Sequence, residues 1–547
     1  MSSAFGQVLE DFVDKGEEGD CGFVDVEPFV LEVVHDVLLE GAVPKEVSAG
    51  GSIWLRRSLW MAEETTEPMS RVEGLRRRRD MAKGYLPYDV DQRLLLPPDM
   101  RAWLPEEHLS LFILDVVSEL DLSAITRVYE AKDTRGRAGY HPVMMVALLV
   151  YAYCVGKPSS RRIERATYED IAFRVLAGDQ HPDHDCIADF RKRHLDALAG
   201  LFLQVLQLCQ KAGLVKLGHV AIDGTKVKAN ASKHKAMSYD RMGEAEKKLE
   251  EQVGQLLAEA ERIDAEEDAQ HGKGKRGDEL PAELKRREDR LRKIREAKAA
   301  LEREAKEKAE ARAAEAKQKL EQRERVEAET GPKAAGPPPK IPDPGQAVPE
   351  PKAQRNFTDP ESRIMPDGAN KGSFVQGYNA QIAVDGEAQI IVASRVTQTP
   401  NDAQQLVPMA EAIRENVGQL AATTSADAGY FSAQNVQDPA LAETNLLVPP
   451  DRQKHGTAPS APPPGPGASA AQRMRHKLSS AEARELYKQR KAIVEPVFGQ
   501  MKEARGFRRF LLRGLQAVRA EFDLIALTHN LLKLFRSGRR PALAATA

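Results

Sequence analysis

The stretch HVAIDGTKVKAN, residues 219–230, places one carboxylate, Asp223, in the middle of a run that otherwise alternates like a buried β-strand. Alternation of apolar and polar residues predicts a strand. A buried carboxylate is costly unless it is paired or binds a metal ion. The simplest interpretation is a structural aspartate, or a turn at the Asp-Gly pair. A functional interpretation requires partner residues elsewhere in the chain.

The overall composition excludes several classes of protein. The chain has 547 residues, enough for more than one domain, and its net charge of −2 indicates no particular partner. Four scattered cysteines without a CxxC pair are typical of a reducing cytoplasm. The His- and Cys-containing stretch 181–194 lacks a zinc-site spacing. The apolar run 143–155 is too short to span a bilayer, so we expect a cytoplasmic protein without a membrane partner.

The N-terminal part divides into two segments. Residues 1–80 form an atypical extension, acidic and then basic, which is either a disordered appended arm or the product of an upstream start site, because residue 81 opens a natural-looking start. Residues 81–213 are predicted to form a helical DNA-binding domain, with Pro142 in the first turn of a buried helix. Five basic residues are expected to be exposed there, either in a helix-turn-helix reader or on a solvated helical face: Arg161, Arg162, Arg191, Lys192 and Arg193.

Two insertions interrupt the rest of the chain. Residues 238–330 are rich in Ala, Glu, Lys, Arg and Leu, with apolar residues three and four apart, which predicts an antiparallel coiled-coil hairpin. Its turn is expected at the glycine-containing break 268–281. The hairpin is a dimerisation arm, a DNA clamp or a spacer. Residues 331–351 and 457–471 are predicted to be proline-rich linkers.

The remaining segments, 214–237, 352–456 and 472–540, have a recognisable order of elements. The stretch 378–396 predicts two strands around an Asp-Gly turn. A helix after Asn401, a short strand ending at Asp427, another short strand from Asn445 and a helix carrying Glu495 follow. This is the order of an α/β ribonuclease H-like domain, a mixed sheet flanked by helices. In that topology the centre of the first strand neighbours the end of the fourth.

The three acids Asp223, Asp427 and Glu495 are therefore predicted to converge. Converging carboxylates repel one another, and without a cation at least one of them would take up a proton. Two Mg²⁺ ions roughly 3.5–4 Å apart use oxygen ligands and serve in-line displacement at phosphorus. We expect these acids to be shared metal ligands.

At this point the sequence resembles the DDE transposases of bacterial insertion sequences, in the branch with a Tyr-Arg-Glu-Lys signature. The matching residues are Tyr487, Arg490, Glu495 and Lys502, although four residues separate the arginine from the glutamate where three are common. The blocks AIDGTKVKANAS, DPESRIMP, YNAQIAVD and ADAGYFS also look like this family's. The resemblance implies a catalytic triad of Asp223, Asp427 and Glu495 that binds two Mg²⁺ ions, for which Mn²⁺ can substitute. It also implies cleavage and strand transfer at terminal inverted repeats, target DNA as second partner, and a homodimer when assembled.

Basic residues near the signature are further candidates for DNA binding. Basic residues clearly outnumber acidic ones between positions 484 and 540. The predicted phosphate contacts are Lys226, Arg505, Arg508, Arg509 and Arg513, in addition to Tyr487, Arg490 and Lys502. Alternatively, some of them neutralise the acidic first arm of the hairpin, and Lys502 is a surface lysine.

Local sequence around the signature predicts where a helix begins. Pro496 suits the first position of a helix, so a new helix is expected to start at Glu495 and to align Glu495, Phe498 and Lys502 in one stripe. No phosphate-cradling GxxxxGK[ST] loop occurs, so ATP is not implied. A metal-dependent nuclease that cuts without joining, and a non-catalytic DNA-binding relic, are the alternative functions.

Overall fold

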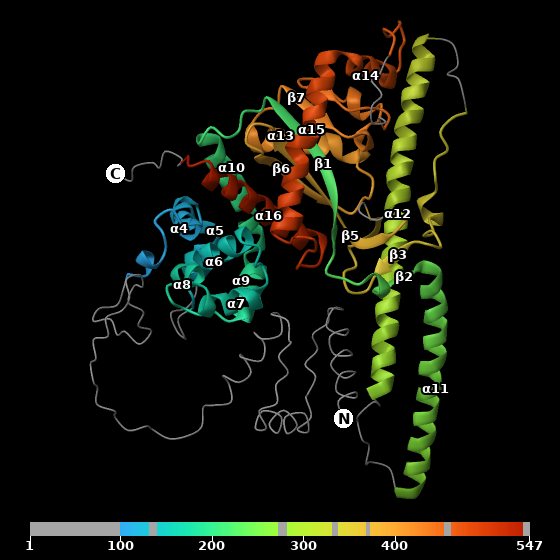
Figure 1. Cartoon of the computed structure of the whole chain (residues 1–547). Helices are drawn as coiled ribbons and strands as arrows, with labels where there is room; N and C mark the ends of the chain where they lie inside the picture. The colour runs from blue at the N-terminus through green and yellow to red at the C-terminus, as the bar shows by residue number, and fades with distance from the viewer. Residues whose placement is uncertain are drawn as a thin grey trace, which may run out of the picture. The chain divides into compact units, whose positions relative to one another are not determined.

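A six-stranded mixed sheet lies at the centre of the computed structural model, which describes residues 99–130, 139–271, 282–330, 337–367, 372–452 and 461–539. β1 (His219–Lys228) is its central strand, antiparallel to β5 and parallel to β7 (Figure 1). β8 pairs parallel with β7, while β4 and β6 both pair antiparallel with β5. The other strands are β4 (Arg363–Pro366), β5 (Phe374–Asp385), β6 (Ile391–Thr397), β7 (Thr423–Ala426) and β8 (Asn445–Leu447). The prediction of a mixed sheet is confirmed.

Helices flank this sheet, as predicted. α15 (Ala481–Gly499) packs on β1, and both α13 (Leu406–Val417) and α16 (Leu515–Arg536) pack on β6. α14 (Ala470–Ser479) precedes α15 and begins with a capping box between Ser469 and Gln472. A π-helical turn, Gln500–Ala504, continues α15.

The helices before β1 share one hydrophobic core with the sheet. α6 is buried along nearly its whole length, because it packs between α4 and α16, and it begins at Pro142 as predicted. α10 packs along α16 and joins the two parts of the core. These helices are α4 (Leu109–Glu119), α5 (Ser123–Glu130), α6 (Pro142–Cys154), α7 (Ser160–Glu169), α8 (Ile171–Leu176), α9 (His184–Arg193) and α10 (Leu195–Lys211).

One arginine of this region is placed differently from the expectation. Arg161, Arg162, Lys192 and Arg193 are exposed, but Arg191 is only 6% exposed. Its guanidinium donates to the Tyr153 hydroxyl and the Pro158 carbonyl, so it holds helices together instead of facing solvent. The prediction of an exposed Arg191 is wrong.

Two long helices follow β1 and pack against each other in opposite directions. Met242 and Leu249 of α11 (Tyr239–His271) form an apolar cluster with Leu291, Ile294, Ala297 and Leu301 of α12 (Ala282–Thr330). Glu246 of α11 pairs with Arg295 and Lys298 of α12, while the Tyr239 hydroxyl reaches Glu302, farther along α12. The predicted break between the helices lies largely at 272–281, outside the described residues, as does the 1–80 extension. The coiled-coil character stays a prediction.

Short elements complete the fold. β2 (Ala236–Ser238) and β3 (Gln354–Asn356) form a two-stranded sheet at the base of α11. Short 3₁₀ helices cover Met100–Trp103, Lys233–Lys235, Pro344–Gln346, Ala403–Gln405, Ala428–Tyr430, Asn435–Gln437 and Pro439–Leu441.

The expected helix start at Glu495 is wrong, because α15 runs without interruption through Pro496. A proline inside a helix removes one N–H and leaves the carbonyl four residues earlier without its helical donor. That carbonyl belongs to Ala492, and it accepts a hydrogen bond from Gln389 Nε2 at 2.9 Å. A side chain from the β5–β6 connection therefore replaces the missing donor.

Candidate active site

Strand register brings two of the three predicted acids together. Ile222 of β1 pairs in parallel with Ala426 of β7, so Asp223 and Asp427 are the next residues along two adjacent strands. Asp223 Oδ1 accepts from the Gly224 N–H at 2.8 Å. Asp427 Oδ1 accepts from the Gly429 N–H at 2.8 Å, which fixes the tight turn that ends β7. The sequence places an acid at the centre of one strand and at the end of the other, and the fold aligns them.

Arg490 supplies the positive charge at this position. Its Nη1 donates to Asp223 Oδ2 at 3.0 Å, and its guanidinium lies 5.9 Å from the centre of the Tyr487 ring. Arg490 is only 7% exposed, and its Nε is a buried donor without a partner within the described residues. Because α15 crosses β1, an arginine distant in sequence meets the carboxylate of the central strand.

The electrostatic environment favours the neutral form of Asp223. Burial, with a smaller contribution from the neighbouring Asp427, raises the pKa of Asp223 to about 6, although Arg490 and the Gly224 N–H oppose the rise. Burial also raises the pKa of the Tyr487 hydroxyl. Desolvation and like charge thus disfavour the ionised form of Asp223, and a bound cation would favour it.

The donor set fits a hard divalent cation in part. Asp223 and Asp427 offer carboxylate oxygens, the ligands that Mg²⁺ prefers. Glu495 is exposed on α15, the helix that also carries Arg490. In the part of the chain that the structure describes, no three His, Cys, Asp or Glu side chains stand close enough to hold a metal ion. Two members of the predicted triad are brought together, and the third lies on the adjoining helix.

Lys502 and Lys226 both contact protein groups. Lys502 Nζ donates to the Thr225 hydroxyl and, at 3.1 Å, to the Lys226 carbonyl, so it links the π-helical turn to β1. Lys226 Nζ lies 3.3 Å from Asp402 Oδ1, and its side chain is only 18% exposed. Burial lowers the pKa of Lys502. Lys502 is therefore no ordinary surface lysine.

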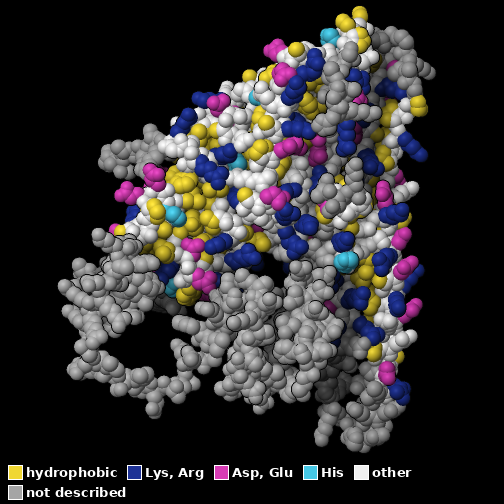
Figure 2. Space-filling model, viewed as in Figure 1, with side chains coloured by type: hydrophobic (Ala, Val, Ile, Leu, Met, Phe, Trp, Pro, Cys, Tyr) yellow, Lys and Arg dark blue, Asp and Glu magenta, His cyan; other side chains and the backbone are white. Residues whose placement is uncertain are grey.

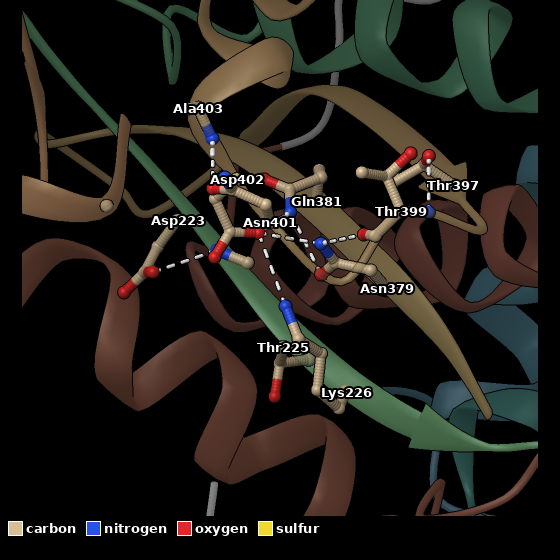
Figure 3. Close-up of polar contacts among 12 residues, drawn as sticks. Asp223, Thr225, Lys226, Asn379, Gln381, Thr397, Thr399, Asn401, Asp402 and Ala403 are labelled. Atoms are coloured by element: carbon tan, nitrogen blue, oxygen red, sulfur yellow. Dashed lines mark hydrogen bonds and ion pairs between the residues drawn. The ribbon is translucent and has the colours of Figure 1, made fainter. Parts of the chain in front are cut away.

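Asp402 is the centre of a polar network that the sequence did not reveal (Figure 3). Its Oδ1 accepts from Asn379 Nδ2 at 2.6 Å and Gln381 Nε2 at 2.8 Å, in addition to Lys226. The Gln381 carbonyl oxygen in turn accepts from the buried Tyr430 hydroxyl. Tyr430 lies three residues beyond Asp427, so the network ties the turn after β7 to β5 and β1.

A glycine makes room for this network. Gly224 pairs with Gln381 across β1 and β5, and a Cβ at Gly224 would overlap the Gln381 carboxamide. The Asp-Gly pair of the opening stretch is thus a feature of the strand and not of a turn. Gly224 lets the Gln381 side chain cross β1 directly beside Asp223.

The basic segment after the π-helical turn is divided between core and surface. Arg505 is only 5% exposed, and its guanidinium donates to the Thr528 hydroxyl and the Ile525 carbonyl inside the core. Burial lowers the pKa of Arg505 to about 10. The prediction of a DNA contact by Arg505 is wrong, because its donors face the core. Arg508, Arg509 and Arg513 are exposed.

The alternative partner for these arginines, the acidic arm, has its own cations. Glu246 and Glu250 of α11 pair with Arg295 and Lys298 of α12. Arg508 pairs with Glu503, and Arg513 Nε donates to the Asn230 carbonyl. Sequence reasoning thus overlooked the basic residues of α12, which neutralise the acidic arm. It also overlooked Asp402, because the Asn401–Asp402 pair resembles the start of a helix.

Comparison with known families agrees with this arrangement. Residues 98–193 match a transposase domain (DUF772), and residues 345–531 match a Transposase DDE domain. No curated protein and no solved structure matches the chain. The second match contains Asp427 and Glu495 and begins after β1.

A DDE transposase domain defines the class of this protein as a nuclease and transesterase. With both matches, the chain belongs to the DDE transposases of insertion sequences. The Tyr-Arg-Glu-Lys signature stays a prediction. Of the helices in the described residues, none combines the length and apolar character needed to span a membrane.

Proposed function

We propose that this transposase binds the terminal inverted repeats of its element and catalyses Mg²⁺-dependent DNA cleavage followed by strand transfer. The observation that supports this most directly is the parallel register of β1 and β7, which aligns Asp223 with Asp427. The strand order β6-β5-β1-β7-β8, antiparallel and then parallel, supports the ribonuclease H-like domain that we expect from the sequence.

Asp223, Asp427 and Glu495 would hold Mg²⁺, or Mn²⁺ in its place. When bound, two such ions lower the pKa of an attacking hydroxyl or water and stabilise charge on the leaving oxygen. In the first step a water oxygen bonds to phosphorus, the bond from phosphorus to the 3′ oxygen breaks, and that oxygen takes up a proton. In the second step the freed 3′ hydroxyl attacks a target phosphodiester, whose own 3′ oxygen leaves.

Basic and aromatic residues around the acids would orient the DNA and neutralise the charge of its phosphates. Arg490 opposes the rise in the pKa of Asp223 before DNA and metal arrive, and its unpartnered Nε would donate to a phosphate oxygen. Tyr487 and Lys502 flank it along α15 and the π-helical turn, and Arg508, Arg509 and Arg513 would contact the backbone of the DNA. Two ends must be joined together, so the assembled protein would be a homodimer. It would act in the cytoplasm, on the nucleoid.

The test is cleavage and joining of DNA that carries the element's own ends. Wild type with Mg²⁺ should release 3′ hydroxyls and join them to target DNA, while Asp223→Asn and Asp427→Asn should do neither. Asp438→Asn, at the half-buried cap of the 3₁₀ helix Pro439–Leu441, is the matched control and should retain activity, because the asparagine side chain can accept the same hydrogen bond from the Ala440 N–H. Cleavage without joining would favour a nuclease, and equal activity in the triad variants would overturn the metal site.

A further inference from the structure

The far end of β1 carries a basic groove, separate from the acids. Beyond Asp223 the strand runs five more residues to Lys228, where a hollow of about 510 Å³ opens. No acidic side chain stands among the described residues that line it. Its basic lining residues are Lys228, Lys233, His234, Lys235, Arg509 and Arg513.

The groove extends onto the long helix α12. An adjoining hollow shares His234 and Lys235 and is lined by Arg286, Arg290 and Lys293 of α12. These three residues are spaced four and three apart, so they form one stripe along the helix. The acidic residue beside them, Asp289, is already paired with Arg292. On the face seen in Figure 2, Lys and Arg side chains gather between the sheet and α12.

The backbone beneath the groove is held by many hydrogen bonds. Lys228 N–H donates to the Arg508 carbonyl, and Phe510 N–H donates to the Lys228 carbonyl, so the 508–510 segment extends the sheet at β1. Glu521, buried in α16, accepts from the N–H groups of Leu511 and Leu512. The basic side chains therefore project from fixed backbone, which lowers the entropy lost on binding.

On the opposite wall, the 232–235 segment is equally fixed. The Asn356 side chain donates to the Ser232 carbonyl, and the Phe357 N–H donates to the Lys235 carbonyl. In both walls, therefore, the backbone that carries the basic side chains around the hollow is fixed. A concentration of cations with little compensating acid binds phosphates and steers them toward the surface.

We infer that this groove, including the stripe on α12, extends the DNA contact proposed for Arg509 and Arg513 and holds the phosphate backbone of the duplex beside the cleavage position. The inference rests on the proposed function and adds a role for the paired helices. From Asp223 to Lys228 the strand covers about 17 Å at 3.3 Å per residue. A duplex that runs along β1, at 3.4 Å per nucleotide along one strand, would meet the Lys228 end of the groove about five nucleotides from the scissile phosphate.

The decisive measurement is the salt dependence of binding, made without metal so that no chemistry occurs. The test variant is the triple Arg286→Ala, Arg290→Ala, Lys293→Ala; the matched control is Lys308→Ala, Arg312→Ala, Lys317→Ala, exposed residues farther along α12. Each lost phosphate contact should reduce the slope of log K against log salt by about 0.9. We expect the test triple to lose about two to three units of slope and at least tenfold in affinity at 0.1 M salt, and the control to match wild type.

A second experiment locates the contact. Neutral methylphosphonate linkages placed one at a time along the duplex should weaken wild-type binding in a cluster that begins about five nucleotides from the cut. The linkages of this cluster that lie on the α12 stripe should have no further effect on the test triple, whereas those beside Lys228 should still weaken its binding. An unchanged slope, or equal losses in test and control, would overturn the inference even if strand transfer occurs. If the test triple changed the sedimentation of the DNA-free protein but left the salt dependence of DNA binding unchanged, this surface would instead be a contact between two copies of the chain.

Discussion

Arg490 Nη1 lies 3.0 Å from Asp223 Oδ2, and this ion pair joins α15 to the centre of β1. Both side chains are largely buried, 8% and 21% exposed. In such a setting the attraction mainly offsets desolvation, while removal of one partner leaves a buried charge unmatched. The pair therefore holds the carboxylate ready for a metal ion.

Arg490→Ala should destabilise the metal-free protein, and more at high pH than at low pH. At pH 8 Asp223 is ionised, so the loss should be about 3–5 kcal/mol, the range for breaking a buried pair. At pH 5, below the pKa of about 6 that Asp223 has in the wild type, this carboxyl is already largely protonated before Arg490 is removed, so the loss should be smaller. Urea unfolding at the two pH values, without Mg²⁺, measures the difference.

Lys491→Ala is the control, since Lys491 is the exposed neighbour and should change stability by less than about 0.5 kcal/mol. An equal loss for Arg490→Ala at pH 5 and pH 8 would contradict the electrostatic explanation. The cause would then be the lost packing of the guanidinium on Tyr487.

Asp223 should also give the wild-type protein a pH-dependent stability. Its folded pKa of about 6 exceeds the ordinary value of 3.8, so the folded state binds more protons than the unfolded state between these values. Stability must fall as pH rises through this window, by roughly 3 kcal/mol for a shift of about two units. Burial also raises the pKa of Asp523 to about 6, so this carboxyl likewise makes stability fall as the pH rises.

Comparison with Asp223→Asn separates the two carboxyls. In metal-free protein the slope of unfolding free energy against pH between 4 and 6 should be smaller in the variant than in wild type. The remaining slope belongs to Asp523 and other groups. Parallel slopes for the two proteins would show that the pKa of Asp223 is close to its ordinary value when folded.

Strands and their order could be predicted because their signals are local. The alternation around Asp223, the Asp-Gly pair at the 385–386 turn and the short run before Asp427 each involve residues only a few positions apart. Which strands pair then follows from the order of the elements along the chain. The parallel pairing of β1 with β7 confirms that the centre of the first strand neighbours the end of the strand before Asp427. The position of Glu495 relative to them depends on how α15 is rotated, which no local pattern specifies.

Burial of charged residues could not be predicted in the same way. Arg191 and Arg505 look like members of exposed basic clusters, but their hydrogen-bond partners lie on other helices. At Asn401–Asp402 the sequence pattern indicates a cap, and Asn401 does accept from the Ala403 N–H. Asp402 is thereby left for Lys226 and two β5 side chains, an arrangement visible only in three dimensions.

The hydrogen bond that replaces the missing donor at Pro496 can be tested with a double-mutant cycle. Gln389→Ala removes the donor to the Ala492 carbonyl and should cost about 1 kcal/mol. In a Pro496→Ala background the helix has its own N–H for that carbonyl, so the cost of Gln389→Ala should fall. Denaturant unfolding of the four proteins gives the coupling energy.

Other effects of Gln389→Ala cancel in this cycle. Gln389 has a positive φ of 58° and accepts from Lys533 Nζ, and both features are lost or strained equally in the two backgrounds. Pro496→Ala alone should stabilise α15, because an interior proline costs about 3 kcal/mol. A coupling energy of zero would mean that the bond from Gln389 contributes nothing to stability.

Gly224→Ala should disrupt the network behind Asp223. The new Cβ would overlap the Gln381 carboxamide, which must leave Asp402 and Tyr430 to make room. Overpacking of this kind costs about 1–3 kcal/mol. Gly254→Ala is the matched control: nothing lies within 4 Å of its Cβ position in α11, so the same substitution should stabilise the helix by up to about 1 kcal/mol.

Truncation of the opposing side chain distinguishes a clash from a backbone effect. If the carboxamide is the obstacle, Gly224→Ala together with Gln381→Ala should be no less stable than Gln381→Ala alone, because the space above β1 is then empty. If instead the strand needs glycine for its own conformation, the loss of stability in the double variant should equal the sum of the losses in the two single variants. Thermal unfolding of the three variants decides between them, and the first outcome would establish that Gly224 is required by its cross-strand partner, Gln381.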